Sequence, residues 1–269
     1  MNEFKRNQRL SVITRILVER PNHIYSLDYF SSMFDAAKST ISEDISIIKD
    51  ALLKTGIGDI VTILGAGGGV KYVSSICREK KADFLNRLCN IISQPDRIIP
   101  GGYIYMNDII YRADFADKIG AILAEYFIDT ELNYIVTVET KGIPLALSVA
   151  RQLDKPLVIV RRESRVTEGS SISINYISGS SKRIQTMSLS RRSIENGSKV
   201  VFIDDFMKAG GTAKGILDLM REFGSEVINN GVLIATSEPK QKLVDNYIAL
   251  LTLYNINEFT NKIDIKPNI

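Results

Sequence analysis

The stretch VVFIDDFMKAGGT, residues 200–212, decides the fold expected for most of the chain. It begins as an apolar strand, delivers two adjacent carboxylates, Asp204 and Asp205, and then turns through small residues into an expected helix. Open α/β sheets bind their ligands at the carboxyl ends of the strands. The backbone N–H groups of such a loop suit a phosphate, which Gly210 and Gly211 allow to approach closely. Because carboxylates repel phosphate, we expect this pair to bind ribose hydroxyls or Mg²⁺.

Strands and helices alternate on both sides of this stretch. We expect strands at 103–106, 133–138, 157–160, 199–203 and 226–234, and helices at about 114–128, 143–153 and 212–223. This alternation predicts an α/β fold with a mostly parallel sheet and helices on both faces. The polar run 163–185 is expected to be a long loop, and such loops in compact domains are usually functional or mobile. The stretch 235–269 offers Tyr247, Tyr254 and Phe259 but no clear base-reading signature.

A second strand-to-helix loop, VETKGIPLA at residues 138–146, agrees with the first. Residues 200–212 resemble the phosphoribosyl-pyrophosphate (PRPP) motif of type I phosphoribosyltransferases, and residues 138–146 resemble the pyrophosphate loop of the same family. The resemblance implies that Asp204 and Asp205 hold the ribose hydroxyls, that residues 209–212 bind the 5-phosphate, and that the long polar run is a mobile hood loop. The effector-binding residues predicted on this basis are Thr140, Lys141, Gly142, Asp204, Asp205, Phe206, Met207, Lys208, Ala209, Gly210, Gly211 and Thr212.

Five side chains near these motifs keep more than one interpretation. Lys208 either contacts the phosphates of the ligand, or projects to solvent or pairs with an acid. Tyr103 and Tyr105 are expected to pack in the sheet or in an interface rather than to bind a base. Arg161 and Arg162 directly follow an expected buried strand, so we expect at least one of them to point into the cleft.

The first 74 residues are expected to form a separate winged helix-turn-helix domain. Helices are predicted over 5–20, after Ser26, and from about Ser39 to Thr55. Two apolar runs, 60–64 and 70–73, flank a glycine-rich tip and predict a β-hairpin. Three helices followed by a hairpin is the order of a winged helix.

The segment 37–45 resembles the start of the recognition helix of bacterial winged-helix repressors. Small hydroxyl residues at a helix N-terminus can donate to phosphates and reach base edges. The predicted DNA-binding residues are Lys38, Ser39, Thr40, Ser42, Lys71, Arg6 and Arg9. Glu43, Asp44 and Asp50 count against DNA binding because they would lie beside phosphate. A small packing domain is the alternative interpretation.

An amphipathic helix predicted at 78–92 links this head, residues 1–74, to a second domain placed at 75–269. The combination resembles the purine operon repressors of Gram-positive bacteria, most specifically through the segments 160–170 and 203–212. The resemblance implies a homodimeric repressor of purine biosynthesis genes that binds double-stranded operator DNA, is released by PRPP and lacks transferase activity. The resemblance also implies that the protein requires no cofactor and that PRPP acts as its effector, with or without Mg²⁺. Whether other phosphorylated nucleotides compete with PRPP stays open.

Two further functions stay open beside this one. The chain could be an active purine phosphoribosyltransferase with an accessory head, which would need a pocket that stacks and reads a free base. A protein-binding adaptor is the third interpretation, and it leaves the Asp204–Thr212 motif without a purpose.

The composition excludes several classes of protein. Of the 269 residues, 45% are hydrophobic and 24% are charged, which is typical of a globular chain. Two cysteines and one histidine are too few for a disulfide framework or a zinc cluster, so we expect no metal site from the protein alone. No apolar run approaches a membrane span and the polar N-terminus is not a signal peptide, which predicts a cytoplasmic protein without a membrane partner.

The formal net charge of +3 is unevenly distributed. Residues 1–74 hold nine Lys/Arg and eight Asp/Glu, a balance of +1, whereas residues 161–192 hold seven Lys/Arg and two Glu, a balance of +5. A basic stretch of this kind suggests a polyanionic partner. We therefore expect the head to read the DNA sequence and the 161–192 stretch to supply much of the attraction for DNA phosphates.

Overall fold

The computed structural model describes residues 4–65, 67–163, 169–177 and 184–268. The chain divides into two compact units, one made of residues up to Arg78 with Arg151–Asp154 and the other of Glu79–Ala150 with Lys155–Ile269. Within the described ranges, no helix has the length and hydropathy that a bilayer-spanning segment needs.

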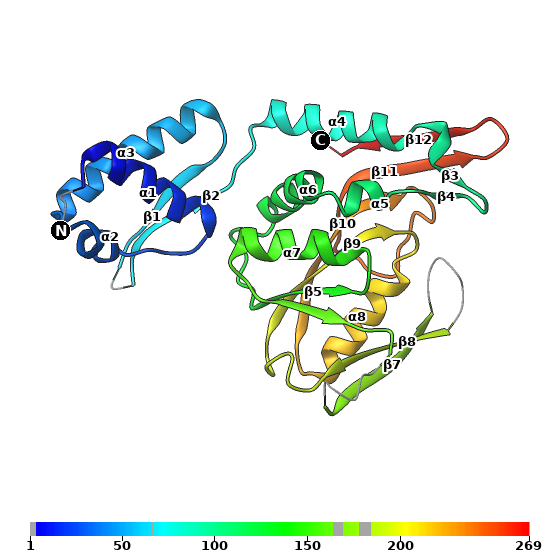
Figure 1. Cartoon of the computed structure of the whole chain (residues 1–269). Helices are drawn as coiled ribbons and strands as arrows, with labels where there is room; N and C mark the ends of the chain where they lie inside the picture. Colours follow the sequence, from blue (N-terminus) through cyan, green and yellow to red (C-terminus); the bar gives the residue numbers. More distant parts are fainter. Residues whose placement is uncertain (1–3, 66, 164–168, 178–183, 269) are drawn as a thin grey trace. The chain divides into compact units, whose positions relative to one another are not determined.

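The N-terminal unit has the predicted winged-helix order (Figure 1). Its elements are α1 (Arg6–Glu19), α2 (Leu27–Phe34), α3 (Lys38–Thr55), β1 (Asp59–Ile63) and β2 (Gly69–Val73). The two strands form an antiparallel hairpin in which Asp59 pairs with Val73 and Ile63 with Gly69. Residue 66 of the predicted glycine-rich tip lies outside the described residues.

Local signals define the helices of this unit, and apolar contacts hold them together. The Ser26 hydroxyl accepts a hydrogen bond from the Tyr29 N–H at 3.2 Å, which caps α2 as predicted. Gly56 ends α3 with a φ of 61°, a conformation in which glycine carries no steric penalty. Ile13, Phe30 and Ile41 bring one face of each helix into a common core, and Ile60 and Val70 close it from the hairpin.

The second unit is built on a six-stranded sheet with the order β12-β11-β10-β9-β5-β6. The strands are β5 (Tyr134–Val138), β6 (Leu157–Val160), β9 (Lys199–Met207), β10 (Glu226–Thr236), β11 (Ile248–Asn257) and β12 (Lys262–Pro267). All neighbouring pairs are parallel except β11 with β12. The predicted α/β fold with a mostly parallel sheet is confirmed.

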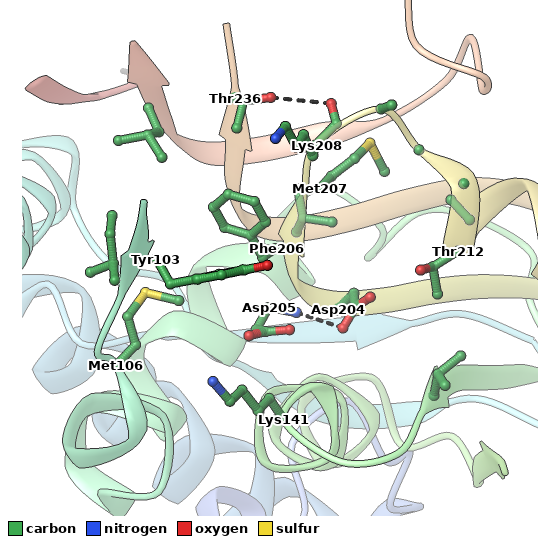
Figure 2. Close-up of a pocket in the computed structure, with 18 of the residues that line it drawn as sticks. Tyr103, Met106, Lys141, Asp204, Asp205, Phe206, Met207, Lys208, Thr212 and Thr236 are labelled. Carbon is green, nitrogen blue, oxygen red and sulfur yellow. Dashed lines mark hydrogen bonds between the residues drawn. The ribbon is translucent and has the colours of Figure 1, made fainter. Parts of the chain in front are cut away.

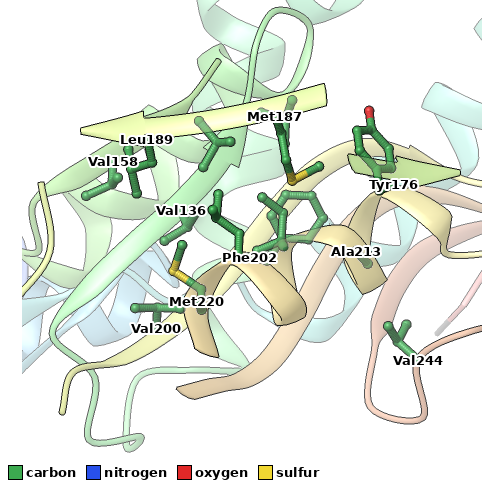
Figure 3. Packing of buried hydrophobic residues seen from close by; sticks show 14 of the residues in the cluster. Val136, Val158, Tyr176, Met187, Leu189, Val200, Phe202, Ala213, Met220 and Val244 are labelled. Carbon is green, nitrogen blue, oxygen red and sulfur yellow. The ribbon is translucent and has the colours of Figure 1, made fainter. Parts of the chain in front are cut away.

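Helices cover both faces of this sheet. Figure 1 shows α6 (Ala113–Glu125) and α7 (Gly142–Leu153) on one face and α8 (Gly211–Glu222) on the other. A core cluster on the α8 side includes Phe202, Met220 and Met187 (Figure 3). Burial of this apolar surface fixes the position of α8, and therefore of the loop that leads into it.

Two small antiparallel hairpins complete the second unit. One joins β3 (Ile98–Ile99) to β4 (Tyr103–Ile104), and the other joins β7 (Ser171–Ile177) to β8 (Ile184–Ser190). The connecting helices are α4 (Arg78–Ile92), a 3₁₀ turn at Pro95–Arg97 and α5 (Asn107–Ile110). The helix predicted at 78–92 is therefore confirmed, and it belongs almost entirely to the second unit.

Several sequence predictions were wrong in this unit. The expected loop 163–185 contains strand β7 and the start of β8, whereas its segments 164–168 and 178–183 lie outside the described residues. Ser171–Ile177 alternates polar and apolar residues, and Ile172, Ile174 and Tyr176 pack on the core beside α8. The strand expected at 103–106 is only two residues long. Two strands, β11 and β12, were missed within 235–269.

Candidate functional site

A cavity of about 700 Å³ opens at the carboxyl ends of the central strands (Figure 2). Its walls come from the β3–β4 hairpin, the loop after β5, the end of β9, the start of α8 and the end of β11. Eleven of the twelve predicted effector-binding residues line it: Thr140, Lys141, Asp204, Asp205, Phe206, Met207, Lys208, Ala209, Gly210, Gly211 and Thr212. The two motifs that the sequence placed on separate strands thus meet at one edge of the sheet.

The carboxylate pair lies at the end of β9, which runs four residues beyond its predicted end. The backbone N–H of Asp205 donates to Asp204 Oδ1 at 2.9 Å. Loss of hydration raises the pKa of Asp204 well above its ordinary value, and the neighbouring Asp205 raises it further. Burial also raises the pKa of Asp205, against the opposing charge of Lys141. Hydroxyl donors or a cation brought by a ligand would stabilise the ionised pair.

The loop after β9 provides the groups that a phosphate needs. Gly210 is the N-cap of α8 with a φ of 81°, a left-handed conformation that favours glycine. The first N–H groups of α8, at Gly211 and Thr212, have no carbonyl partner within the helix. Free N–H groups and the positive end of the helix dipole together favour an anion at this position.

The loop after β5 faces the carboxylates of Asp204 and Asp205 across the cavity. Thr140 and Lys141 line the cavity, and the Glu139–Thr140 peptide bond is cis. Gly142, the twelfth predicted residue, is not part of the wall and instead packs behind it. A Cβ atom at Gly142 would lie 2.4 Å from Thr137 Oγ1 and 2.9 Å from Asp204 Oδ1. Its role is therefore to let the loop approach β9 closely.

We expect Gly142→Ala to damage the site through this contact. Thr137 is fully buried, so it cannot move aside without disturbing β5. Overpacking of this kind costs about 1–3 kcal/mol, and displacement of Asp204 should also weaken ligand binding. Urea unfolding of the variant measures the first effect. Gly67→Ala is the matched control because a Cβ there meets nothing within 4 Å, and equal stability of the two variants would contradict the prediction.

Two further residues line the cavity, Tyr103 against expectation and Arg162 in agreement with it. Tyr103 was expected to pack in the sheet or an interface, but it lines the cavity, and Figure 2 shows its ring reaching toward Phe206 and Asp205. Arg162 lines the cavity as predicted for at least one arginine of its pair, whereas Arg161 lies 3.4 Å from Glu139 Oε2.

The predicted DNA-binding residues of the head fall into two groups. Lys38, Ser39 and Ser42 are exposed at the start of α3, and Thr40 beside them is half-buried. Lys71 lies on β2, where its ammonium group donates to Asn22 Oδ1 at 2.6 Å. Lys38 also lies 2.6 Å from Asp28 Oδ1, and its side chain and those of Ser39 and Ser42 are exposed to a ligand that approaches the N-terminus of α3.

Arg6 and Arg9 form the second group, because both bind the buried carboxylate of Asp44. Their Nε atoms lie 3.0 and 2.8 Å from the two oxygens of Asp44, which is completely buried. Arg6 also lies 3.5 Å from Glu43. Asp44 was expected to lie beside DNA phosphate, but it is buried and paired with two arginines, whereas Glu43 remains 71% exposed.

The basic stretch 161–192 is only partly described. Arg191 and Arg192 are exposed at the end of β8, and Arg162 lies in the cavity wall. Arg165, Lys182 and Arg183 lie outside the described residues. The predicted contact of this stretch with DNA therefore stays a prediction.

Comparison with known proteins agrees with both units. Residues 5–74 match the family described as bacterial purine repressor, N-terminal, and residues 107–266 match the phosphoribosyl transferase domain. The chain is 45% identical to the purine biosynthesis transcriptional repressor PurR of Bacillus subtilis over 98% of this chain and 93% of that protein. It is 38% identical to the purine biosynthesis transcriptional activator PurR of Lactococcus lactis subsp. lactis, over 98% and 97%.

A solved structure shows the same fold for the second unit. Adenine phosphoribosyltransferase from Rhodothermus marinus superposes with a TM-score of 0.55 and 24% identity, covering 64% of this chain and 99% of the enzyme. The likeness to the regulators extends over the head as well as the second unit. The chain therefore belongs to the PurR family of purine biosynthesis transcriptional regulators, with a DNA-binding N-terminal domain and a phosphoribosyltransferase-fold domain.

Proposed function

We propose that this protein represses purine biosynthesis genes by binding operator DNA as a homodimer, and that PRPP bound in the cavity releases it. The observation that supports this most strongly is the cavity itself. It combines a carboxylate pair for ribose hydroxyls, a helix N-terminus for the 5-phosphate, and Lys141 for the pyrophosphate. Repression is proposed rather than activation because the relative named a repressor shares more residues with the chain.

Charge gives a physical route from PRPP to DNA release. PRPP brings several negative charges into a cavity lined by Lys141, Arg162 and Lys208. These charges reduce the attraction between the protein and DNA phosphates. A tenfold change in DNA affinity requires about 1.4 kcal/mol of coupling between the two sites.

The carboxylate pair also suits Mg²⁺. Oxygen atoms are the ligands that this ion prefers, and it is usually held by one or two carboxylates together with phosphate groups. Among the described residues, no three His, Cys, Asp or Glu side chains lie close enough to hold a metal by themselves. We propose that any Mg²⁺ enters with PRPP. Other phosphorylated nucleotides would use the same phosphate contacts and would compete with it.

Gel-shift titrations of operator DNA test the proposal. Affinity should fall steeply with salt if phosphate contacts dominate, and millimolar PRPP should weaken binding at least about tenfold. An operator affinity that is unchanged by saturating PRPP would overturn the role of PRPP. Sedimentation of the protein–DNA complex gives the number of chains bound to each operator.

We expect Lys38→Glu to weaken operator binding at least about tenfold, because it places a negative charge where α3 meets phosphate. Lys54→Glu is the matched control. Both lysines are exposed on α3, each lies 2.6 Å from an aspartate carboxylate, and both substitutions change the net charge equally. Equal losses in the two variants would show that net charge, rather than the N-terminus of α3, governs binding.

We further propose that the phosphoribosyltransferase fold acts here as a sensor and not as an enzyme. Incubation with PRPP and each purine base should then release no pyrophosphate above the uncatalysed rate. Release with any base would support the alternative, an active purine phosphoribosyltransferase with an accessory head.

A further inference from the structure

A buried lysine lies behind the phosphate loop. Lys242, in the segment between β10 and β11, is only 8% exposed. Lysine is almost never buried unless its ammonium group is paired. Within the described part of the chain, Lys242 forms no ion pair with a carboxylate, and it does not line the cavity. Its burial therefore needs another explanation.

The contacts of Lys242 provide one, because its ammonium group is held by oxygen atoms. Nζ donates to the Lys208 carbonyl at 2.5 Å, to the Thr236 carbonyl at 2.8 Å and to Thr236 Oγ1 at 3.2 Å. The Thr236 hydroxyl also lies 3.1 Å from the Lys208 carbonyl (Figure 2). Three donors thus meet three acceptors, which ties the end of β10 to the start of the phosphate loop.

Leu243, the next residue, adds a further hydrogen bond to the phosphate loop. The backbone N–H of Leu243 donates to the Ala209 carbonyl at 2.9 Å. Two successive carbonyls of the loop, at Lys208 and Ala209, are therefore held toward the 242–243 segment. In a trans peptide the N–H points opposite to the carbonyl. The N–H groups of Ala209 and Gly210 consequently point away from the 242–243 segment, and both residues line the cavity.

Electrostatics adds a second effect of the same side chain. Burial lowers the pKa of Lys242, while Glu238 opposes this shift. An ammonium group held in a poorly hydrated position interacts more strongly with a nearby anion than one in water. Lys240, two residues earlier in the same segment, is exposed and provides a natural comparison.

We infer that Lys242 is a positioning residue of the phosphate site: it orients the N–H groups of Ala209 and Gly210 and places a positive charge behind a bound phosphate. The inference rests on the proposed function only for the identity of the ligand, PRPP. Lys242 lies behind the loop and acts through it.

Three variants test this inference in the full-length protein. Lys242→Met removes both the charge and the hydrogen bonds, Lys242→Gln removes the charge but keeps a donor, and Lys240→Met is the matched control. Hydrogen–deuterium exchange of the Leu243 and Lys214 amides, which donate to the Ala209 and Gly210 carbonyls, reports the position of the loop without ligand. Calorimetric titration with PRPP reports affinity, and thermal unfolding reports folding.

We expect Lys242→Met to speed exchange of the Leu243 and Lys214 amides and to bind PRPP at least about tenfold more weakly, with Lys240→Met equal to wild type. Lys242→Gln should keep slower exchange than the Met variant but still lose affinity, a separation that a purely structural role would not produce. If the Met variant fails to fold, the Gln variant decides. Exchange and affinity equal to wild type in Lys242→Gln would overturn the inference. If wild type binds no PRPP, the proposed function fails, and exchange alone then decides the positioning role.

Discussion

Asp204→Asn is expected to weaken PRPP binding at least about tenfold, because a hydrogen bond to a charged group contributes about 1.5–3 kcal/mol. Asparagine has nearly the same shape and keeps an Oδ1 that can accept the Asp205 N–H. The substitution therefore removes charge and leaves the geometry of β9 intact. Calorimetric titration measures the affinity, and gel shifts should show operator DNA that PRPP no longer releases.

The pH dependence of binding identifies the charge as the cause. The pKa of Asp204 is raised mainly by loss of hydration, so a proton must leave before the carboxylate can serve a hydroxyl or a cation. PRPP affinity of the wild type should therefore fall as the pH drops through the raised pKa. Comparison with the same titration of Asp204→Asn removes the protonation of PRPP itself, which both proteins share.

The stability of the folded protein should depend on pH in the opposite direction to PRPP affinity. A carboxyl whose pKa is higher in the folded protein than in the unfolded chain destabilises the fold as the pH rises through the folded value. The neutral asparagine avoids this cost, so Asp204→Asn should be at least as stable as wild type at pH 8. Asp218→Asn, on the surface of α8, is the control for binding. PRPP-dependent release that persists in Asp204→Asn would mean that the ligand binds elsewhere.

Asp44→Ala is expected to destabilise the head strongly, by about 3–5 kcal/mol. Asp44 is completely buried and accepts from Arg9, whose side chain is only 13% exposed, as well as from Arg6. Removal of the carboxylate leaves the Arg9 guanidinium poorly hydrated, with the Phe4 carbonyl but no opposite charge beside it. Arg6 is 52% exposed, so water can replace its contact.

A double-mutant cycle separates this ion pair from simple loss of packing. Arg9→Met should be destabilising by itself, and addition of Asp44→Leu should restore part of the stability, because an apolar pair can replace a buried ionic one. Urea unfolding followed by a probe in the head measures each variant. Strictly additive effects would show that Arg9 and Asp44 do not act as a pair.

The roles of Arg6, Arg9 and Asp44 show where inference from single residues fails. Arg6 and Arg9 have the charge of DNA-binding residues, and Asp44 has a charge that repels DNA. Whether such groups face solvent or one another depends on how α1 packs against α3, and residues 35 positions or more apart in the chain carry no local sign of that contact. Lys242 was overlooked for a similar reason, since a lysine in a polar segment ordinarily projects into water.

Secondary structure was predicted well where the apolar residues followed a single helical or strand-like spacing. The strands at 133–138 and 157–160 and the helix at 78–92 agree closely with β5, β6 and α4. Prediction failed for β7, where a polar composition concealed the alternation that buries Tyr176. It also failed at the end of β9, which was expected to end at Ile203 but continues through the two carboxylates to Met207.

The sequence by itself determined the chemistry of the site. The strand, acid pair and glycine loop of residues 200–212 follow one another along the chain, so their order is visible without a structure. The tertiary structure alone decided which distant groups complete that site. Parallel pairing of β5 with β9 brings Lys141 to Asp205, and the loop after β10 brings Lys242 to the carbonyl of Lys208. Contacts of this kind form when apolar faces are buried together, and that burial depends on the whole chain rather than on any local pattern.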